Sequence, residues 1–318
     1  MQPQMHSITP ISFPIKGGHV HRSGWPYVTN ILESIRDARY GIPFDDFIEK
    51  TFLNGREGLS RFSYEEPWIG VAHYPPQVPS WYVTERLESV LSSESFMSSL
   101  RNLRLCISFS PEQKQWIDEN WNVNTTLLRH PTEVPDVKWT PERFESNPKR
   151  QIVQVGWYLR NTAAIFQLRE CPRLAKCWLR SSRSIAALNH LLCSRHFARE
   201  REVREDVTVL DYVPNHEYDK LLSENIVFIE LLSSVANNTI IECIARNTPV
   251  LVNRMSGPEF YLGTDYPLFY EHIDDVPNLC SLSRIIDAFT YLRDMDKEWI
   301  RGSYFLKTLC SSIDLAFR

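Results

Sequence analysis

Short apolar runs alternate with amphipathic stretches along most of this 318-residue chain. In the first part, the runs predict strands at 8–15, 68–72, 105–109 and 125–128, with amphipathic segments at 27–38 and 82–91. In the second part, they predict strands at 151–155, 207–213, 226–231 and 249–252, and helices from 162 and over 217–222 and 239–245. Apolar strands that alternate with helices are typical of a parallel sheet covered on both faces. We therefore expect an α/β fold with two Rossmann-like domains.

The segment 131–150 separates these two parts. It combines prolines and charged residues with no sustained apolar period. Because proline limits helix formation and sheet pairing, the segment is typical of a linker or an irregular edge. The predicted domains are residues 1–145 and 146–318. In open parallel sheets, ligands bind beyond the carboxyl ends of the strands, so the candidate chemistry is sought there.

Composition narrows the possible partners. The formal net charge is only -4, whereas a protein that binds nucleic acid usually presents a strongly basic face. No apolar run approaches the ~20 residues of a membrane-spanning helix. The first residues lack the basic start and apolar stretch of a signal peptide. We expect a cytoplasmic protein with no membrane span and no nucleic-acid partner.

Several common chemistries lack their motifs in this chain. The seven cysteines are scattered without a CxxC pair or a His/Cys cluster, which predicts reduced thiols and no structural zinc. GxGxxG, the P-loop lysine motif, GxSxG and HExxH are absent. Asp294-Met295-Asp296 has the DxD form of a metal site, but it lies in a long helical pattern over 285–309. Carboxylates at i and i+2 of a helix do not converge on one metal, so none is expected.

The segment 226–253 holds the most informative residues. A strand is predicted to end near Leu232, and a helix follows from about Thr239, with Asn238 as its N-cap. The free N–H groups of the first helical turn, together with Asn237, favour a phosphate there. Glu242 shares a helix face with Asn238, and its carboxylate can accept two ribose hydroxyls. The alternative is that the asparagines are only caps and Glu242 is a solvated first-turn acid.

Two stretches near this helix resemble a known family. Glu242-Cys243-Ile244-Ala245-Arg246-Asn247-Thr248-Pro249-Val250-Leu251 resembles the Glu-Ala-Met-Ala-x-Gly-Thr-Pro-Val-Val stretch of retaining glycosyltransferases with the GT-B fold. Ser256-Gly257-Pro258-Glu259, where Gly257-Pro258 predicts a turn, is similar to the family's Gly-Gly-x-x-Glu. Ser234 stands where the family has an acidic residue, eight positions before the helix Glu, so no catalytic carboxylate is assigned there. The resemblance implies two Rossmann-like domains facing a cleft, with the donor on the second, and allows the C-terminal helix to cross back to the first.

The resemblance extends to a third stretch, QIVQVGWYLRNT at 151–162. A strand followed by Gly156, with Arg160 and Asn161 in the next loop, is similar to the GT-B arrangement of a glycine with a nearby Arg or Lys. A guanidinium binds phosphate oxygens at two points. Alternatively, Gly156 only makes a turn and Arg160 a surface ion pair. Tyr212 and Val213 are placed by the resemblance near the nucleobase, although structural packing explains them equally well.

Candidate bases lie in the first part of the chain. Lys16-Gly17-Gly18-His19-Val20-His21 is similar to the glycine-rich loop of GT-B enzymes, where two glycines allow the backbone to approach a ligand. His19, His21 and His73, which ends the strand WIGVAH, are candidates because imidazole titrates near neutral pH. Each histidine also fits a surface position. Trp25, Trp68 and Trp81 fit either acceptor stacking or a core.

Together these observations predict a glycosyltransferase (EC 2.4 class) that moves a sugar from a nucleotide-diphosphate sugar to an acceptor of unknown identity. Arg160 and the helix N-terminus would stabilise the departing diphosphate, which elsewhere is the work of a metal, so no cofactor is expected. Gly17, Gly18 and Glu259 complete the predicted donor contacts. The alternative, kept open by Ser234, is a non-catalytic GT-B-like module that binds a nucleotide or glycan.

Overall fold

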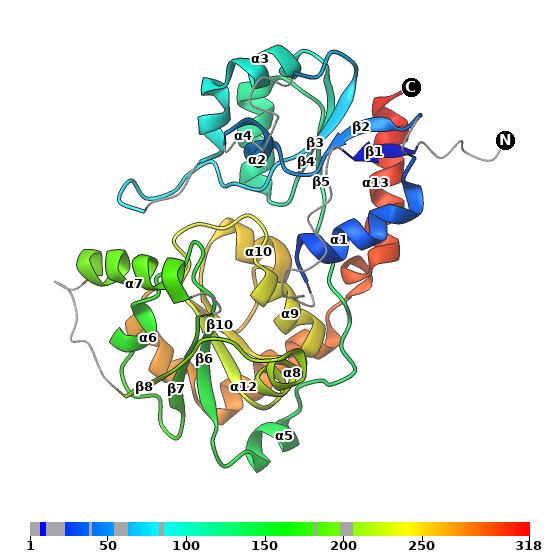
Figure 1. Cartoon of the computed structure of the whole chain (residues 1–318). Coiled ribbons are helices and arrows are strands. Elements are labelled where there is room, and N and C mark those ends of the chain that lie inside the picture. Colours follow the sequence, from blue (N-terminus) through cyan, green and yellow to red (C-terminus); the bar gives the residue numbers. More distant parts are fainter. Residues whose placement is uncertain are drawn as a thin grey trace. The chain divides into compact units, whose positions relative to one another are not determined.

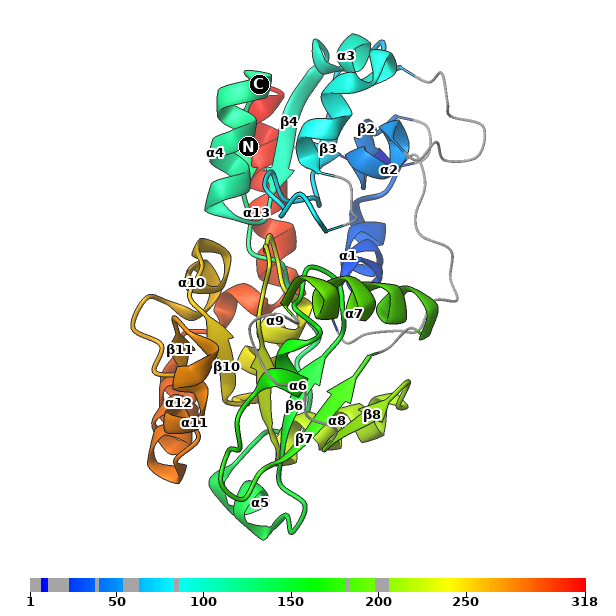
Figure 2. The same cartoon turned by 90° about the vertical axis from the view of Figure 1, so that its left-hand side faces the viewer.

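The computed structural model describes residues 7–10, 23–37, 40–53, 63–82, 86–180, 183–197 and 206–318. These residues form two compact units (Figure 1, Figure 2). The first unit draws on Met1–Gln77, Glu85–Glu133 and Glu298–Arg318, and the second on Val78–Thr84 and Val134–Lys297. Each unit contains one parallel sheet with helices, so the α/β class predicted from the sequence is confirmed.

The sheet of the first unit has five parallel strands in the order β1-β2-β3-β4-β5. The strands are β1 (Ile8–Pro10), β2 (Ile42–Asp45), β3 (Trp68–Val71), β4 (Leu103–Ser108) and β5 (Thr125–Leu127). The helices are α1 (Trp25–Leu32), η1 (Glu33–Ile35), α2 (Ile48–Phe52), η2 (Leu87–Ser92), α3 (Glu94–Leu100), α4 (Pro111–Trp121), η4 (Glu298–Ile300) and α13 (Gly302–Ala316). Every residue of β3 is buried, as expected for a parallel strand covered on both faces.

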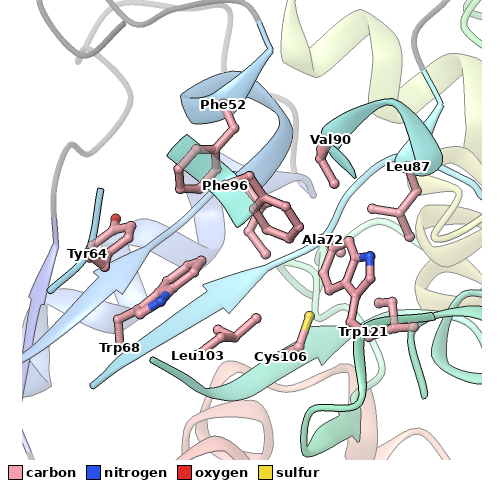
Figure 3. Packing of buried hydrophobic residues seen from close by; sticks show 12 residues of the cluster. Phe52, Tyr64, Trp68, Ala72, Leu87, Val90, Phe96, Leu103, Cys106 and Trp121 are labelled. Atoms are coloured by element: carbon pink, nitrogen blue, oxygen red, sulfur yellow. The ribbon is translucent and has the colours of Figure 1, made fainter. Parts of the chain in front are cut away.

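An aromatic cluster forms the core between this sheet and helices α2, η2, α3 and α4 (Figure 3). Tyr64 stacks on Trp68 with ring centroids 4.2 Å apart, and Phe96 lies 4.9 Å from Trp121. The indole N–H of Trp68 donates to the carbonyl of Ser99 at 2.8 Å, which satisfies the one polar group of that ring. Trp68 is therefore a core residue, not an acceptor platform.

The sheet of the second unit has six parallel strands in the order β11-β10-β9-β6-β7-β8. The strands are β6 (Gln151–Val155), β7 (Ala175–Leu179), β8 (Val207–Leu210), β9 (Ile226–Ile229), β10 (Val250–Asn253) and β11 (Phe269–Tyr270). The helices are α5 (Pro141–Ser146), α6 (Ala164–Gln167), α7 (Arg183–Phe197), α8 (Asn215–Glu224), α9 (Asn238–Arg246), α10 (Ser256–Leu262), η3 (Ile273–Asp275), α11 (Val276–Leu279) and α12 (Leu282–Asp294).

The order of the strands in this second sheet reverses between β6 and β9. From β6 the chain proceeds outward through β7 to β8, and it then returns to β9 on the other side of β6 and continues to β10 and β11. The loops that leave β6 and β9 therefore start side by side at one edge of the sheet. Such a reversal is where open parallel sheets bind their ligands.

Most predicted elements of the second unit are present, with shifted ends. The strand predicted at 151–155 is β6, and the helix predicted at 239–245 is α9 with one more residue at each end. β9 ends at Ile229, not near Leu232, because the chain beyond it pairs with the loop after β6 through the bridge between Arg160 and Leu231. β2, β7 and β11 were not predicted.

The helical pattern predicted over 285–309 is interrupted. α12 ends at Asp294, Met295 takes an extended conformation, and η4 and α13 follow after a break. The amine of Lys297 bonds the carbonyl of Leu292 and, at 2.6 Å, the side-chain oxygen of Asn247, which closes the end of α12. The break coincides with the passage of the chain from the second unit to the first. Helix α13 (red in Figure 1) then contacts α1 and β4 of the first unit.

Apart from the short stretch Val78–Thr84, which already belongs to the second unit, the chain passes from the first unit to the second inside the segment 131–150, between Glu133 and Val134. The sequence prediction ended the first domain at residue 145 instead. Residues 134–145 belong to the second unit because Trp139 is fully buried and its backbone N–H donates to the carbonyl of Arg246 at 2.8 Å. Lys138 likewise bonds the carbonyl of Ala245 at 2.5 Å.

Candidate functional site

The loop that leaves β6 begins with a glycine that no other residue replaces easily. Gly156 has φ of +76°, a left-handed conformation that favours glycine. A Cβ atom at this position would lie 3.2 Å from Nη1 and 3.3 Å from Cζ of Arg160. The guanidinium of Arg160 therefore lies directly against the glycine backbone. Leu159 also has a positive φ, of 55°, and such strained non-glycine residues cluster at functional sites.

Arg160 is a buried cation, with 9% of its surface exposed. Its Nη1 donates to the carbonyl of Tyr158 at 3.0 Å, and its Nη2 donates to Asn237 at 3.3 Å and Thr239 at 3.1 Å. Its Nε has no hydrogen-bond partner, and no carboxylate of a described residue lies within 4.0 Å of the guanidinium. Burial lowers the pKa of Arg160 to about 10, so it remains charged at neutral pH. The charge of Glu242 opposes this shift from a distance, but no carboxylate among the described residues contacts the guanidinium. A buried cation without a carboxylate in contact favours an anionic ligand.

The N-terminus of α9 lies beside this guanidinium. The side chain of Asn237 is the N-cap and accepts the N–H of Ile240 at 3.2 Å. The predicted N-cap, Asn238, is instead the first helical residue and is half-buried. The two asparagines have the same propensity, so sequence alone cannot separate them. The first-turn N–H groups have no acceptor inside the helix, and together with Arg160 they make this corner electropositive.

Glu242 lies one turn further along α9 and is 1% exposed. Its Oε2 accepts the phenol of Tyr218, from α8, at 2.5 Å. Burial and the carboxylate of Glu242 raise the pKa of Tyr218 well above its usual value, so the phenol stays protonated and donates. The interpretation of Glu242 as a solvated first-turn acid is therefore wrong. A buried carboxylate that a phenol orients can also accept hydroxyl groups.

Tyr82 completes this cluster from a distant part of the sequence. Its phenol oxygen accepts the N–H of Leu159 at 2.8 Å and lies 3.5 Å from the carbonyl of Trp157. Burial raises the pKa of Tyr82 to about 12. The phenol thus holds the strained loop from which Arg160 projects. Neither Tyr82 nor Tyr218 was singled out from the sequence, because nothing in the chain marks which distant tyrosine reaches a given loop.

In the first unit, His73 lies just beyond the carboxyl end of β3. Its Nε2 is 2.9 Å from the carbonyl oxygen of Asp46. A carbonyl can only accept, so Nε2 carries the hydrogen and Nδ1 holds the lone pair that a general base needs. Phe47 lies 4.1 Å from the imidazole, centroid to centroid, and Trp25 meets it edge-on at 4.7 Å. Gly17, Gly18, His19 and His21 lie outside the described residues.

Comparison with solved structures shows which known fold this chain shares. No family model and no curated protein matches the chain. A trehalose-phosphate synthase (UDP-forming) from Burkholderia vietnamiensis matches with a TM-score of 0.54 and 10% identity, over 87% of this chain and 72% of its own. The sucrose-phosphate synthase of Thermosynechococcus elongatus matches with a TM-score of 0.59 and 15% identity, over 92% and 76%. A trehalose-6-phosphate structure from E. coli, bound with UDP-2-fluoro glucose, matches with a TM-score of 0.57 and 11% identity, over 91% and 75%.

These structural neighbours are GT-B glycosyltransferases. This chain has a GT-B glycosyltransferase-like fold. The resemblance seen in the sequence is thereby confirmed at the level of the fold. At 9–15% identity the likeness does not extend to activity. Within the described ranges, no helix combines the length and the apolar character needed to cross a bilayer.

Four of the residues predicted to bind the donor come together in the GT-B-like second unit. Gly156, Arg160, Asn237 and Thr239 are joined by contact or hydrogen bonds at the strand-order reversal. Asn161 is buried beside them, but its side chain accepts the N–H of Ala163 at 3.1 Å and so shapes the loop. Its role toward a donor stays a prediction.

Other predicted residues occupy different surroundings. Tyr212 is 56% exposed, and Val213 follows it in the loop after the edge strand β8, two strands away from β6. Glu259 pairs with Arg254 at 2.6 Å near the surface. Gly257 and Pro258 lie in the first turn of α10, so the turn predicted there is wrong. Pro258 is compatible with this helix because, as its third residue, it needs no N–H partner there.

The remaining candidates for metal chemistry are also located. Asp294 is the last residue of α12 and bonds Arg293 at 2.7 and 3.0 Å, while Asp296 follows the helix. The placement of both aspartates inside a continuous helix was therefore wrong. Among the residues that the structure describes, no three His, Cys, Asp or Glu side chains are grouped to hold a metal ion. All seven cysteines are free thiols, and six are buried.

Proposed function

We propose that the protein is a glycosyltransferase that takes a sugar from a nucleotide-diphosphate sugar bound by the second unit. The observation that carries this proposal is the guanidinium of Arg160. It is buried, positively charged, without a carboxylate within 4.0 Å among the described residues, and bonded to the N-terminal turn of α9. A diphosphate supplies the charge that this site lacks.

The ribose of the donor is assigned to Glu242 in this proposal. The buried carboxylate accepts the phenol of Tyr218 at Oε2. A carboxylate can accept several hydrogen bonds at once, and a vicinal diol offers two donors. The phenol of Tyr218 keeps the carboxylate oriented before the donor arrives, which lowers the entropy lost on binding.

In the proposed reaction an acceptor hydroxyl attacks the anomeric carbon of the sugar. The new carbon–oxygen bond forms as the bond to the diphosphate breaks, and the hydroxyl proton passes to a base. We assign the base to His73, whose Nδ1 carries the lone pair when Nε2 donates to Asp46. Negative charge grows on the departing diphosphate, where Arg160 and the N–H groups of α9 stabilise it. Because these groups supply positive charge, we propose that transfer needs no divalent metal.

A second candidate function is a binding module without catalysis. Ser234, which stands where the resembling family has an acidic residue, lies against α10, since a Cβ on Gly257 would be 3.0 Å from its Oγ. A hydroxyl in place of a carboxylate removes one charge that would face a sugar. This favours binding of a nucleotide or glycan without turnover.

A thermal-shift panel of nucleotide sugars tests the donor proposal first. It starts with UDP-sugars, because one structural neighbour is UDP-forming and another is bound with UDP-2-fluoro glucose. A ligand that binds only the folded protein raises its melting temperature. Release of nucleoside diphosphate with an acceptor mixture then separates the two functions. Binding of a nucleotide sugar without release of nucleoside diphosphate supports the binding module. If no nucleotide sugar binds, the assignments of Arg160 to the diphosphate and of Glu242 to the ribose are both contradicted.

A further inference from the structure

Glu49 is a buried carboxylate without a cation. It lies in α2, has no exposed surface, and among the described residues has no Lys, Arg or His nitrogen within 4.0 Å. Its Oε1 accepts two backbone N–H groups, those of His73 at 2.7 Å and Tyr74 at 2.6 Å. Its Oε2 has no hydrogen-bond partner in the described chain. Burying an unpaired charge is costly, so the position of Glu49 calls for an explanation beyond packing.

The two N–H groups that Glu49 binds belong to the turn that presents His73. Leaving β3, the chain bends at Tyr74, whose carbonyl accepts the amide of Gln113 at 2.9 Å. Glu49 therefore holds the N–H groups of the turn, and Gln113 holds the carbonyl of Tyr74. Because both kinds of backbone group are held, the orientation of the Cα–Cβ bond of His73 is fixed.

The imidazole itself is held by residues just ahead of Glu49 in the chain. Asp46 supplies the carbonyl that meets Nε2, and Phe47 supplies the ring that lies against the imidazole. Residues 46–49 thus bind the backbone and the side chain of His73 together. If the turn at His73 and Tyr74 shifts while residues 46–49 stay in place, the hydrogen bond between Nε2 and the carbonyl of Asp46 is lost. The imidazole then loses its preference for one tautomer.

We propose that Glu49 is a positioning residue for His73: it binds the backbone of residues 73 and 74 so that the imidazole keeps Nε2 on Asp46 and presents Nδ1 as the basic nitrogen. The geometric part stands on the contacts alone. Its catalytic consequence rests on the proposed function, in which His73 takes the proton of the acceptor.

The strength of this hold depends on whether Glu49 is ionised, because an ionised acceptor makes stronger hydrogen bonds than a neutral one. Burial raises the pKa of Glu49 to about 7, the two N–H groups oppose that rise, and the carboxylate of Asp45 adds to it. The thiol of Cys106 on β4 also faces Glu49, but burial raises its pKa well above its usual range, so it is neutral. Among the described residues, the imidazole of His73 is a further titratable group beside this turn. Acid therefore loosens the turn.

Three variants test the proposal. Glu49→Met keeps the length of the side chain and removes both oxygens. Glu49→Gln keeps an oxygen that can accept the same two N–H groups. Ile117→Ala is the matched control, because it removes apolar contacts from the same core and takes no atom from the hydrogen bonds of the turn.

The decisive measurement is the nitrogen-15 spectrum of the His73 ring at pH 8.5, assigned by its loss in His73→Gln. We expect one protonated and one unprotonated ring nitrogen in the wild type, in Glu49→Gln and in Ile117→Ala. We expect averaged signals in Glu49→Met, because both tautomers become populated. A single tautomer in Glu49→Met would overturn the proposal, since the turn would then be held without Glu49.

Turnover supplies the second readout. Glu49→Met should lower kcat at least tenfold while the KM for the donor changes less than twofold, because the donor is held by the other unit. Glu49→Gln should restore most of that kcat. A kcat in Glu49→Met equal to that of Ile117→Ala contradicts the catalytic consequence. The ring spectrum needs no substrate, so the two proposals can fail separately. If the wild type turns over no nucleotide sugar but Glu49→Met still shows averaged tautomers, the proposed function is refuted and the positioning role of Glu49 stands.

Discussion

Among the described residues, each unit buries one charged group that no opposite charge contacts, and the two charges have opposite signs. In the second unit the guanidinium of Arg160 has no carboxylate within 4.0 Å among the described residues, and in the first the carboxylate of Glu49 has no cation within the same limit. Burial lowers the pKa of Arg160 to about 10 and raises that of Glu49 to about 7. The first group stays charged at neutral pH, whereas the second is partly neutral.

This difference in charge at neutral pH follows from the ordinary pKa values of the two side chains. An arginine begins so far above neutral pH that burial does not discharge it, so its charge persists at neutral pH. A glutamate begins close enough to neutral pH that burial brings its titration into the working range. The site at Arg160 therefore attracts anions at every pH near neutrality. The hydrogen bonds from Glu49 to the turn at His73 and Tyr74 instead vary in strength with pH.

The largest expected effect comes from Arg160. Arg160→Ala should lower turnover about 10²–10³-fold, the usual cost of removing a group that stabilises charge in the transition state. Arg160→Lys should keep donor binding better than turnover, because an ammonium lacks the two-point geometry of a guanidinium. The measurements are kcat by nucleoside diphosphate release and donor affinity by calorimetry. Arg293→Ala, which removes an exposed guanidinium, is the control, and wild-type turnover in Arg160→Ala would remove Arg160 from the site.

The stability of the protein should report the charge on Glu49. Its pKa in the folded state is about 7 and its ordinary value is 4.5, so the folded form binds the proton more tightly. The associated stability is full below pH 4.5 and is lost as the pH rises through 7, by up to ~3 kcal/mol at 1.36 kcal/mol per pKa unit. Denaturant melts of the wild type and Glu49→Gln at several pH values check this. Parallel curves for the two proteins would show that Glu49 is not the titrating group.

Replacing Glu242 should weaken donor binding by about 1–3 kcal/mol, the range for hydrogen bonds to a charged group. Tyr218 loses its acceptor in Glu242→Ala, so Tyr218→Phe is measured beside it to separate the loss of orientation from the loss of the carboxylate. We expect Tyr218→Phe to have the smaller effect. Unchanged calorimetric affinity in a folded Glu242→Ala protein would end the ribose assignment.

Chelation should have the smallest effect. If Arg160 and the α9 N-terminus supply the positive charge that the diphosphate needs, turnover continues in excess EDTA. The double variant Asp294→Asn, Asp296→Asn should also remain active, because Asp294 bonds its neighbour Arg293 at the end of α12. Loss of turnover in EDTA that manganese restores would mean that the electrostatic role given to Arg160 is incomplete.

The parts that the sequence predicts well are those built from contiguous residues. The apolar strand at 151–155, Gly156 and Arg160 lie close in the chain, and the rule that parallel strands share a carboxyl edge places them beside the helix at 238–246. Tyr82 escapes such reasoning because the residue it holds, Leu159, is 77 positions away. Glu49 escapes it for the same reason, since an acid in a short helix looks solvated until the turn at His73 and Tyr74 is placed against it. The break at Met295 is hidden because the apolar period continues through it.

The return of the chain to the first unit at Glu298 has a consequence for how the protein is made. Phe305, Leu309 and Ile313 of α13 are buried in the first unit, where α13 contacts α1 and β4, yet they leave the ribosome after every residue of the second unit. The first unit begins synthesis earlier but remains unfinished until the second has been synthesised. Because domains generally fold as units during synthesis, the second unit can complete its core while the first still exposes apolar surface. A chain truncated after Lys297 and released should therefore carry a folded second unit and a first unit that chaperones still recognise.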